Sequence, residues 1–235
     1  AHLVSWKGSD GRERMFVSSQ SALDGSKAIR GGVPIIFPQF AARGGGMRHG
    51  FARVLDWQVA QNGHEGDWTF VVLTLTEEDL PPSTAATFPF PFKLVLRVAV
   101  RANELAMTLS VMNTGPKEFP FAAALHTYHL VDDLASVRID GVEPRTLSIS
   151  DKLDKVYEGI GGTITLQSAA GKLRLEQSGF TDAVVWNPGA ADAAALADMA
   201  DDEYRRFVCV EPAALGPVTL APKTVWRGEY RVIAI

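Results

Sequence analysis

The sequence has only one cysteine among its 235 residues, and this excludes an internal disulfide. That residue, Cys209, lies in an apolar run and is expected to be a small buried hydrophobic side chain. No apolar run reaches the length that a membrane-spanning helix needs, and no signal-peptide pattern or Asn-x-Ser/Thr acceptor occurs. These absences predict a cytoplasmic protein that does not contact a membrane.

Positive charge is also in short supply, because 23 Lys and Arg face 27 Asp and Glu for a net charge of −4. This balance argues against a general nucleic-acid binder. The sequence lacks a Gly-x-x-x-x-Gly-Lys phosphate loop and a Gly-x-Ser-x-Gly nucleophile elbow. His126 and His129 are three residues apart, but no histidine–carboxylate cluster surrounds them. We therefore expect no metal and no other cofactor.

Sustained helical periodicity is nearly absent, whereas short strand-like segments recur along the whole chain. They predict one domain over residues 1–235, an all-β antiparallel sandwich with long loops. Since the chain opens directly in a strand-like segment, we expect the first strand to lack a neighbour. Residues 190–200 are read as a short helix or a loop, and the proline-rich residues 77–92 as a surface loop. Strands are predicted at 3–7, 14–18, 57–60, 68–76, 93–101, 105–112, 121–129, 137–139, 145–148, 163–167, 173–176, 183–186, 206–210 and 225–233.

Two strand-like segments carry the strongest candidates for chemistry. In the first, residues 121–129, alternation places Ala122, Ala124 and His126 on one face, so that small side chains leave an open floor under an imidazole. In the second, an apolar strand ends in Glu211, and such strands seldom contain a carboxylate unless it is paired or functional. The two residues form a possible acid–base pair. The alternatives are a histidine bonded to a backbone carbonyl and a structural ion pair.

A glycine-rich segment, residues 19–53, contains the cations Arg30, Arg48, His49 and Arg53 in an otherwise acidic protein. Arginine binds phosphate or carboxylate through two parallel hydrogen bonds, and glycine lets the backbone approach a ligand. The pattern indicates a small anionic ligand, although a solvated loop with scattered arginines would look the same.

Two further acids are weaker candidates. Asp182 begins an apolar strand that ends in Trp and Asn, a combination suited to the hydroxyls and ring face of a polyol. Asp154 lies in a polar loop and could join that site or remain a solvated charge.

These segments together resemble the hexose-6-phosphate mutarotases, the glucose-6-phosphate 1-epimerases of the galactose-mutarotase-like superfamily. The resemblance lies in Arg-Gly-Gly-Val-Pro-Ile-Ile-Phe-Pro-Gln-Phe, His-Gly-Phe-Ala-Arg, Leu-His-Thr-Tyr, Asp-Ala-Val-Val-Trp-Asn-Pro-Gly, Asp-Met-Ala-Asp-Asp-Glu-Tyr and Phe-Val-Cys-Val-Glu-Pro-Ala, at residues 30–40, 49–53, 125–128, 182–189, 198–204 and 207–213. The motifs occur in family order over almost the whole chain. Two positions depart from the family pattern, since relatives carry Gln at Arg48 and often Phe at His129.

The resemblance implies a large β-sandwich (supersandwich) that binds one small molecule, a hexose phosphate. It implies an isomerase, which we expect to be a monomer. It implies His126 as general acid and Glu211 as general base, Arg30 and Arg53 as phosphate ligands, and His49 and Asp182 as hydroxyl ligands. Arg48 would add a third cation, and Asp154 would join the hydroxyl ligands. Ring opening would need Glu211 ionised and His126 protonated, on opposite sides of the hemiacetal. The alternatives are a non-catalytic sugar-binding module and a mutarotase for unphosphorylated sugars.

Overall fold

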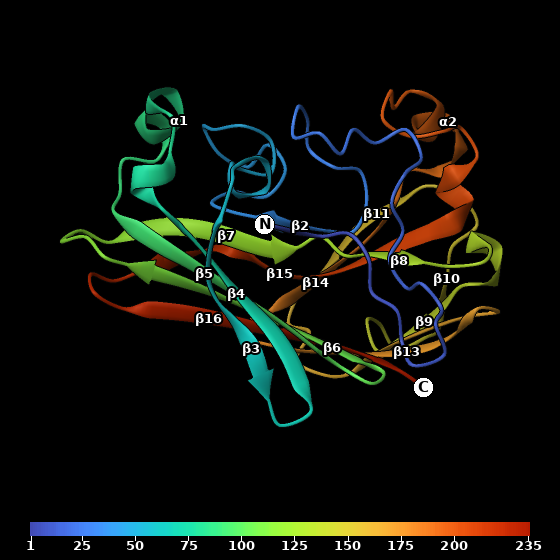
Figure 1. The fold of residues 1–235 in the computed structure, drawn as a ribbon. Helices are drawn as coiled ribbons and strands as arrows, with labels where there is room; N and C mark the ends of the chain where they lie inside the picture. Colours follow the sequence, from blue (N-terminus) through green and yellow to red (C-terminus); the bar gives the residue numbers. More distant parts are fainter.

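Two antiparallel sheets stacked face to face make up most of the computed structural model, which describes residues 1–235 (Figure 1). The first sheet has the order β1-β2-β7-β15-β14-β11, with β8 also paired to β15. Its strands are β1 His2–Leu3, β2 Val33–Ile36, β7 Phe119–Leu125, β8 Tyr128–Leu130, β11 Leu153–Tyr157, β14 Asp182–Asn187 and β15 Phe207–Leu220.

The second sheet has the order β10-β9-β12-β13-β16-β6-β5-β4-β3. Its strands are β3 Gln58–Glu65, β4 Trp68–Thr76, β5 Phe92–Arg101, β6 Glu104–Asn113, β9 Arg138–Asp140, β10 Leu147–Ser148, β12 Ile164–Ser168, β13 Gly171–Ser178 and β16 Val225–Ala234. One buried apolar cluster contains side chains of both sheets, among them Phe37, Leu96, Val210 and Val232. The prediction of an antiparallel β-sandwich is confirmed.

Alternation along the first sheet decides which side chains are available for a site. On β15, Val208 and Val210 belong to the core between the sheets, whereas Cys209 and Glu211 face the other way. The outer face is itself covered, because Ile36, Ala124 and other apolar residues form a separate buried cluster there. A strand buried on both faces is apolar almost throughout, which explains the low polarity around Glu211.

The helices are short and lie with several long loops above the first sheet (Figure 1). They are α1 Pro82–Thr87 and α2 Gly189–Ala194, with the 3-10 helices η1 Ala52–Val54, η2 Glu77–Asp79, η3 Leu134–Ser136 and η4 Glu203–Arg206. None has the length and apolar character that a membrane crossing would require.

Several expected boundaries were wrong for identifiable reasons. Residues 3–7 and 14–18 form no continuous strand pair. After β1 this segment makes only isolated bridges, one between Lys7 and Glu13 across a turn at residues 8–11 and one between Met15 and His129. The expected surface loop at 77–92 contains η2 and α1, since Thr76 and Asp79 form a capping box and Pro82 begins the helix. The polar loop expected around Asp154 is the edge strand β11.

Candidate active site

A cavity of about 460 Å³ opens on the outer face of the first sheet, below the loops that precede and follow β2. This volume lies in the range typical of small-molecule sites. Seven of the eight predicted site residues line it, namely Arg30, Arg48, His49, Arg53, His126, Asp154 and Glu211. They come from segments separated by up to 181 residues in sequence, from Arg30 to Glu211.

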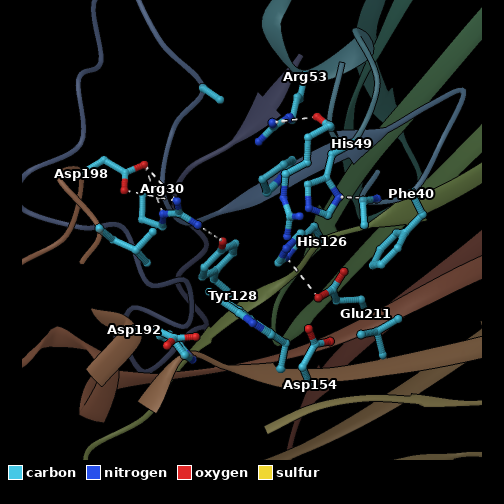
Figure 2. Close-up of a pocket in the computed structure, with 18 of the residues that line it drawn as sticks. Arg30, Phe40, His49, Arg53, His126, Tyr128, Asp154, Asp192, Asp198 and Glu211 are labelled. Carbon is cyan, nitrogen blue, oxygen red and sulfur yellow. Dashed lines mark hydrogen bonds and ion pairs between the residues drawn. The ribbon is translucent and has the colours of Figure 1, made fainter. Parts of the chain in front are cut away.

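His126 and Glu211 meet on the cavity floor because β7, β8 and β15 pair there. β15 pairs with β7 at Ala124 and with β8 at Tyr128, so that His126 lies in the short break between these two strands. Its backbone N–H donates to the Pro34 carbonyl, which holds the break against β2. The ring Nδ1 of His126 lies 3.2 Å from Oε1 of Glu211 (Figure 2).

This close approach is not an aligned hydrogen bond, since His126 Nδ1 and Glu211 Oε2 are buried without a hydrogen-bond partner. Burial lowers the pKa of His126 well below its usual value, and the nearby His49, Arg30 and Arg53 lower it further. Burial also raises the pKa of Glu211 well above its usual value, with repulsion from Asp154 as a second cause. Burial in the free protein therefore favours the neutral form of the pair, with the proton on Glu211, over the charged form with the proton on His126.

For ring opening the sequence analysis expected ionised Glu211 and protonated His126, the reverse of the form that is favoured in the free protein. The physical reason is that both groups are almost fully buried, so that both charged forms are disfavoured. The two side chains lie next to each other, and their expected placement on opposite sides of the hemiacetal stays a prediction. Neighbouring groups can still serve both oxygens of a hemiacetal, since these oxygens are bonded to the same carbon.

His49 lies directly above His126, with 5.5 Å between the ring centroids. Its Nδ1 accepts a hydrogen bond from the backbone N–H of Ala41, so the ring proton is on Nε2. Burial, followed by repulsion from Arg53, Arg48 and Arg30, lowers the pKa of His49 to about 3. His49 is therefore a neutral hydrogen-bond donor at the cavity wall.

Gly50 makes this position of His49 possible. Gly50 has a φ of +69°, and a Cβ there would lie 2.0 Å from the carbonyl oxygen of Phe37. We expect Gly50→Ala to destabilise the protein by more than about 3 kcal/mol, because a clash with rigid backbone adds to left-handed strain. Gly66→Ala is the control, since φ is +62° but no atom lies within 4 Å of the place that a Cβ would occupy. Urea unfolding should show only about 1 kcal/mol for this control; equal losses would contradict the role of the clash.

Arg30 is held in place by two partners. Its Nε and Nη2 donate to both carboxylate oxygens of Asp198 at 3.2 Å, and its Nη1 donates to the hydroxyl of Tyr128 at 3.2 Å. Tyr128 in turn stacks on the ring of His126, with 4.8 Å between centroids. A guanidinium has five N–H donors, so two remain available for a ligand.

The positive charges of Arg48 and Arg53 have no carboxylate partner in the protein, unlike that of Arg30. The only hydrogen bond of the Arg53 side chain goes to the backbone carbonyl of Arg48, and its Nε is buried without a partner. Burial lowers the pKa of Arg53, and repulsion from Arg30 and Arg48 lowers it further. Arg48 is exposed at the cavity rim and Arg53 is half-buried. This side of the cavity thus has an excess of positive charge and unused donors, which is what an anion requires.

Asp154 and Asp182 have different positions. Asp154 lies on β11 opposite Trp186 of β14, and both side chains line the cavity. Asp182 does not line it, because its carboxylate accepts the backbone N–H of Leu215 at 3.0 Å in a buried position beyond the cavity. The structure therefore does not bring Asp182 to the site, and its buried hydrogen bond supports the strand pair instead.

The sequence analysis missed several residues of the cavity. Tyr128 and Asp198 hold Arg30, and Lys152 pairs with Asp192 of α2 at 2.7 Å on the rim. In the sequence, Asp198 was part of a motif to which no role was assigned. No signal linked it to Arg30, which lies 168 positions earlier.

One compact group of potential metal ligands lies on the floor, where atoms of His126, Cys209 and Glu211 are all within 4.8 Å of one another. Burial raises the pKa of the Cys209 thiol well above its usual value. The expectation that no metal takes part stays a prediction. His129 faces the other way, with its Nε2 at 3.1 Å from the hydroxyl of Tyr230 in the second sheet.

Comparison with known proteins agrees with this fold. The family model described as aldose 1-epimerase matches residues 1–154 and 142–232. A protein of Cenchrus ciliaris, provisionally assigned as a glucose-6-phosphate 1-epimerase, is 33% identical over 99% of this chain and 78% of its own length. The crystal structure of YeaD from Salmonella typhimurium, provisionally assigned as a mutarotase, superposes with a TM-score of 0.89 at 27% identity, over 99% of this chain and 83% of that one.

A galactose mutarotase-related enzyme from Lactobacillus acidophilus has the same fold, with a TM-score of 0.71 at 15% identity over 96% of this chain and 88% of that one. The architecture is therefore the galactose-mutarotase-like sandwich. The chain belongs to the aldose 1-epimerase family. It is an isomerase that interconverts the anomers of a sugar.

Proposed function

We propose that the sugar is a hexose 6-phosphate, with glucose 6-phosphate as the first candidate, and that no cofactor takes part. The main support is that one cavity contains both the His126–Glu211 pair and a group of three arginines, Arg30, Arg48 and Arg53. A neutral sugar offers no partner for this positive charge, whereas a phosphate dianion offers three strong acceptor oxygens. The provisional assignment of the Cenchrus relative points to the same substrate.

In the proposed mechanism, the base removes the proton of the C1 hydroxyl while the acid protonates the ring oxygen. The ring opens, the C1–C2 bond rotates, and the ring closes on the other face of the carbonyl. His126 and Glu211 share the one proton that this exchange needs, and closure restores it to the donor. Trp186 and Asp154, opposite the arginines, are positioned to contact the ring face and its hydroxyls.

Exchange NMR tests this proposal directly. The exchange rate between the α and β anomers would be measured at equilibrium for glucose 6-phosphate and for glucose, each with and without the protein. Strong acceleration of the phosphorylated sugar alone is expected. Equal acceleration of both sugars would favour a general aldose mutarotase, and saturable binding without acceleration would favour a sugar-binding module.

Replacing Arg30 by alanine tests the role of the arginines in binding. Because the phosphate is remote from the reacting carbon, Arg30→Ala should raise KM by about tenfold to a hundredfold and change kcat little. Arg174→Ala is the control, because Arg174 lies on β13 of the second sheet and pairs with Glu176. An unchanged KM in Arg30→Ala would remove this residue from the phosphate site.

A further inference from the structure

The cavity has an electric field that opposes the charged form of its own acid–base pair. Figure 2 shows Arg30, His49 and Arg53 on one side of His126, and Glu211 with Asp154 on the other. Moving the shared proton from Glu211 to His126 would create a positive charge next to the arginines and a negative charge next to Asp154. Both changes are unfavourable while no anionic ligand is bound, because Asp198 compensates only Arg30.

The titratable and charged groups around His126 line this cavity, apart from Cys209, which is fully buried next to His126 and Glu211. Cys209 contributes no charge, because burial keeps its thiol protonated through a raised pKa. Burial likewise raises the pKa of Tyr128, so its phenol is neutral. The groups that face the pair are Arg30 before β2, His49 and Arg53 after β2, Tyr128 on β8, Asp154 on β11, and Cys209 with Glu211 on β15.

An anion at the arginines would reverse this field. Arg30 and Arg53 now lower the pKa of His126 by repulsion, and a dianion bound between them would add two negative charges there. Arg53 is free to bind it, because its Nε has no partner and its side chain makes only one hydrogen bond. The proton then leaves the Glu211 carboxyl and joins His126 across 3.2 Å, which forms a carboxylate base and an imidazolium acid. The number of bound protons does not change, so this shift needs no change in pH.

We propose that dianion binding and sugar binding are separable, and that a free inorganic dianion in the arginine group activates the protein toward unphosphorylated aldoses. This further activity rests on the proposed function, since it assigns the arginines to a phosphate. It goes beyond binding, because the dianion prepares the acid and the base for the reaction. Without a dianion, a neutral sugar would bind next to a His126–Glu211 pair that is still in its neutral form, and its anomers would exchange slowly.

Phosphite is a suitable probe because it is a small dianion without a sugar. Glucose anomer exchange would be measured with the protein at increasing phosphite concentration, with potassium chloride at equal ionic strength as the control. Phosphite with Glu211→Gln protein measures the exchange that phosphite itself catalyses. We expect a saturable rise in the protein-dependent rate of about tenfold or more, the change in protonation that one pKa unit produces.

A second readout does not depend on turnover. The ¹⁵N shifts of the His126 ring would be followed in sugar-free protein, where phosphite should convert a neutral imidazole to an imidazolium at constant pH. Arg53→Ala should weaken both responses, and Arg48→Ala, at an exposed position, serves if Arg53→Ala does not fold.

The two proposals fail in different ways. If glucose 6-phosphate exchange is accelerated but phosphite neither protonates His126 nor raises the glucose rate, the activation is wrong and the substrate assignment stands. If glucose 6-phosphate is not accelerated, the proposed function is wrong. A His126 ring that stays neutral with phosphite bound overturns the activation in either case.

Discussion

Replacing Glu211 by glutamine should slow protein-dependent anomer exchange by about 10²–10⁴-fold, the usual contribution of a positioned acid–base group. Glutamine has almost the same shape but can neither store nor release the shared proton. His126→Asn should have an effect of similar size. Because the two residues act on one proton, the double variant should be hardly slower than either single variant.

The measurement is the NMR exchange rate together with a binding titration of glucose 6-phosphate, which should remain saturable in Glu211→Gln. Glu143→Gln is the matched control, because Glu143 pairs with Lys155 outside the cavity. A Glu211→Gln protein within about threefold of the parent rate would show that the pair does not perform the proton transfer. Loss of binding together with rate would indicate a structural role instead.

Acid should destabilise the protein well before its ordinary carboxylates are protonated. Burial lowers the pKa of His49 to about 3 and the pKa values of His2 and His129 to about 4. In the unfolded chain all three residues bind a proton near pH 6.5, so their contribution to stability is complete above this pH and is lost as the pH falls toward 4. The His126–Glu211 pair has one proton in both states near pH 5.5 and cancels. The three histidine protons then give a loss of about 4.1 kcal/mol per pH unit, and the N-terminal amine, whose pKa burial lowers to about 5, adds to it.

Urea unfolding between pH 7.5 and 4.5 measures this slope. His129→Phe removes one of these buried proton sites and should reduce the slope by about 1.4 kcal/mol per pH unit. Loss of the Tyr230 contact adds a destabilisation that does not depend on pH. His64→Phe is the control, because His64 lies on the exposed edge strand β3. A slope unchanged by His129→Phe would mean that this histidine does not contribute to acid unfolding.

Local patterns in the sequence were sufficient for the fold because they are physical requirements of strands and turns. Strand β4, Trp68–Thr76, was predicted at its observed bounds, since alternation and turn residues act over short distances. Strand β2, Val33–Ile36, was missed because it is buried on both faces and shows no alternation.

The site was predictable to the extent that rare residues occur in apolar strands, as His126 and Glu211 do. Their protonation state was not predictable, because it depends on burial and on charges brought from distant loops. Asp182 is a residue for which the sequence predicted more than the structure shows. Its position at the start of a strand suggested ligand binding, but a buried N–H of Leu215 uses its carboxylate. Only the three-dimensional neighbours distinguish these two outcomes.

The burial of β15 on both faces also affects the newly synthesised chain. Residues 207–215 are consecutively buried in the fold, and in the unfolded chain they would form an exposed apolar segment of the kind that aggregates. Glu211 and Pro212 interrupt this segment with a charge and a residue that cannot extend a β-ladder. The carboxylate proposed as a catalytic group thus also protects the polypeptide from self-association before the sandwich has formed.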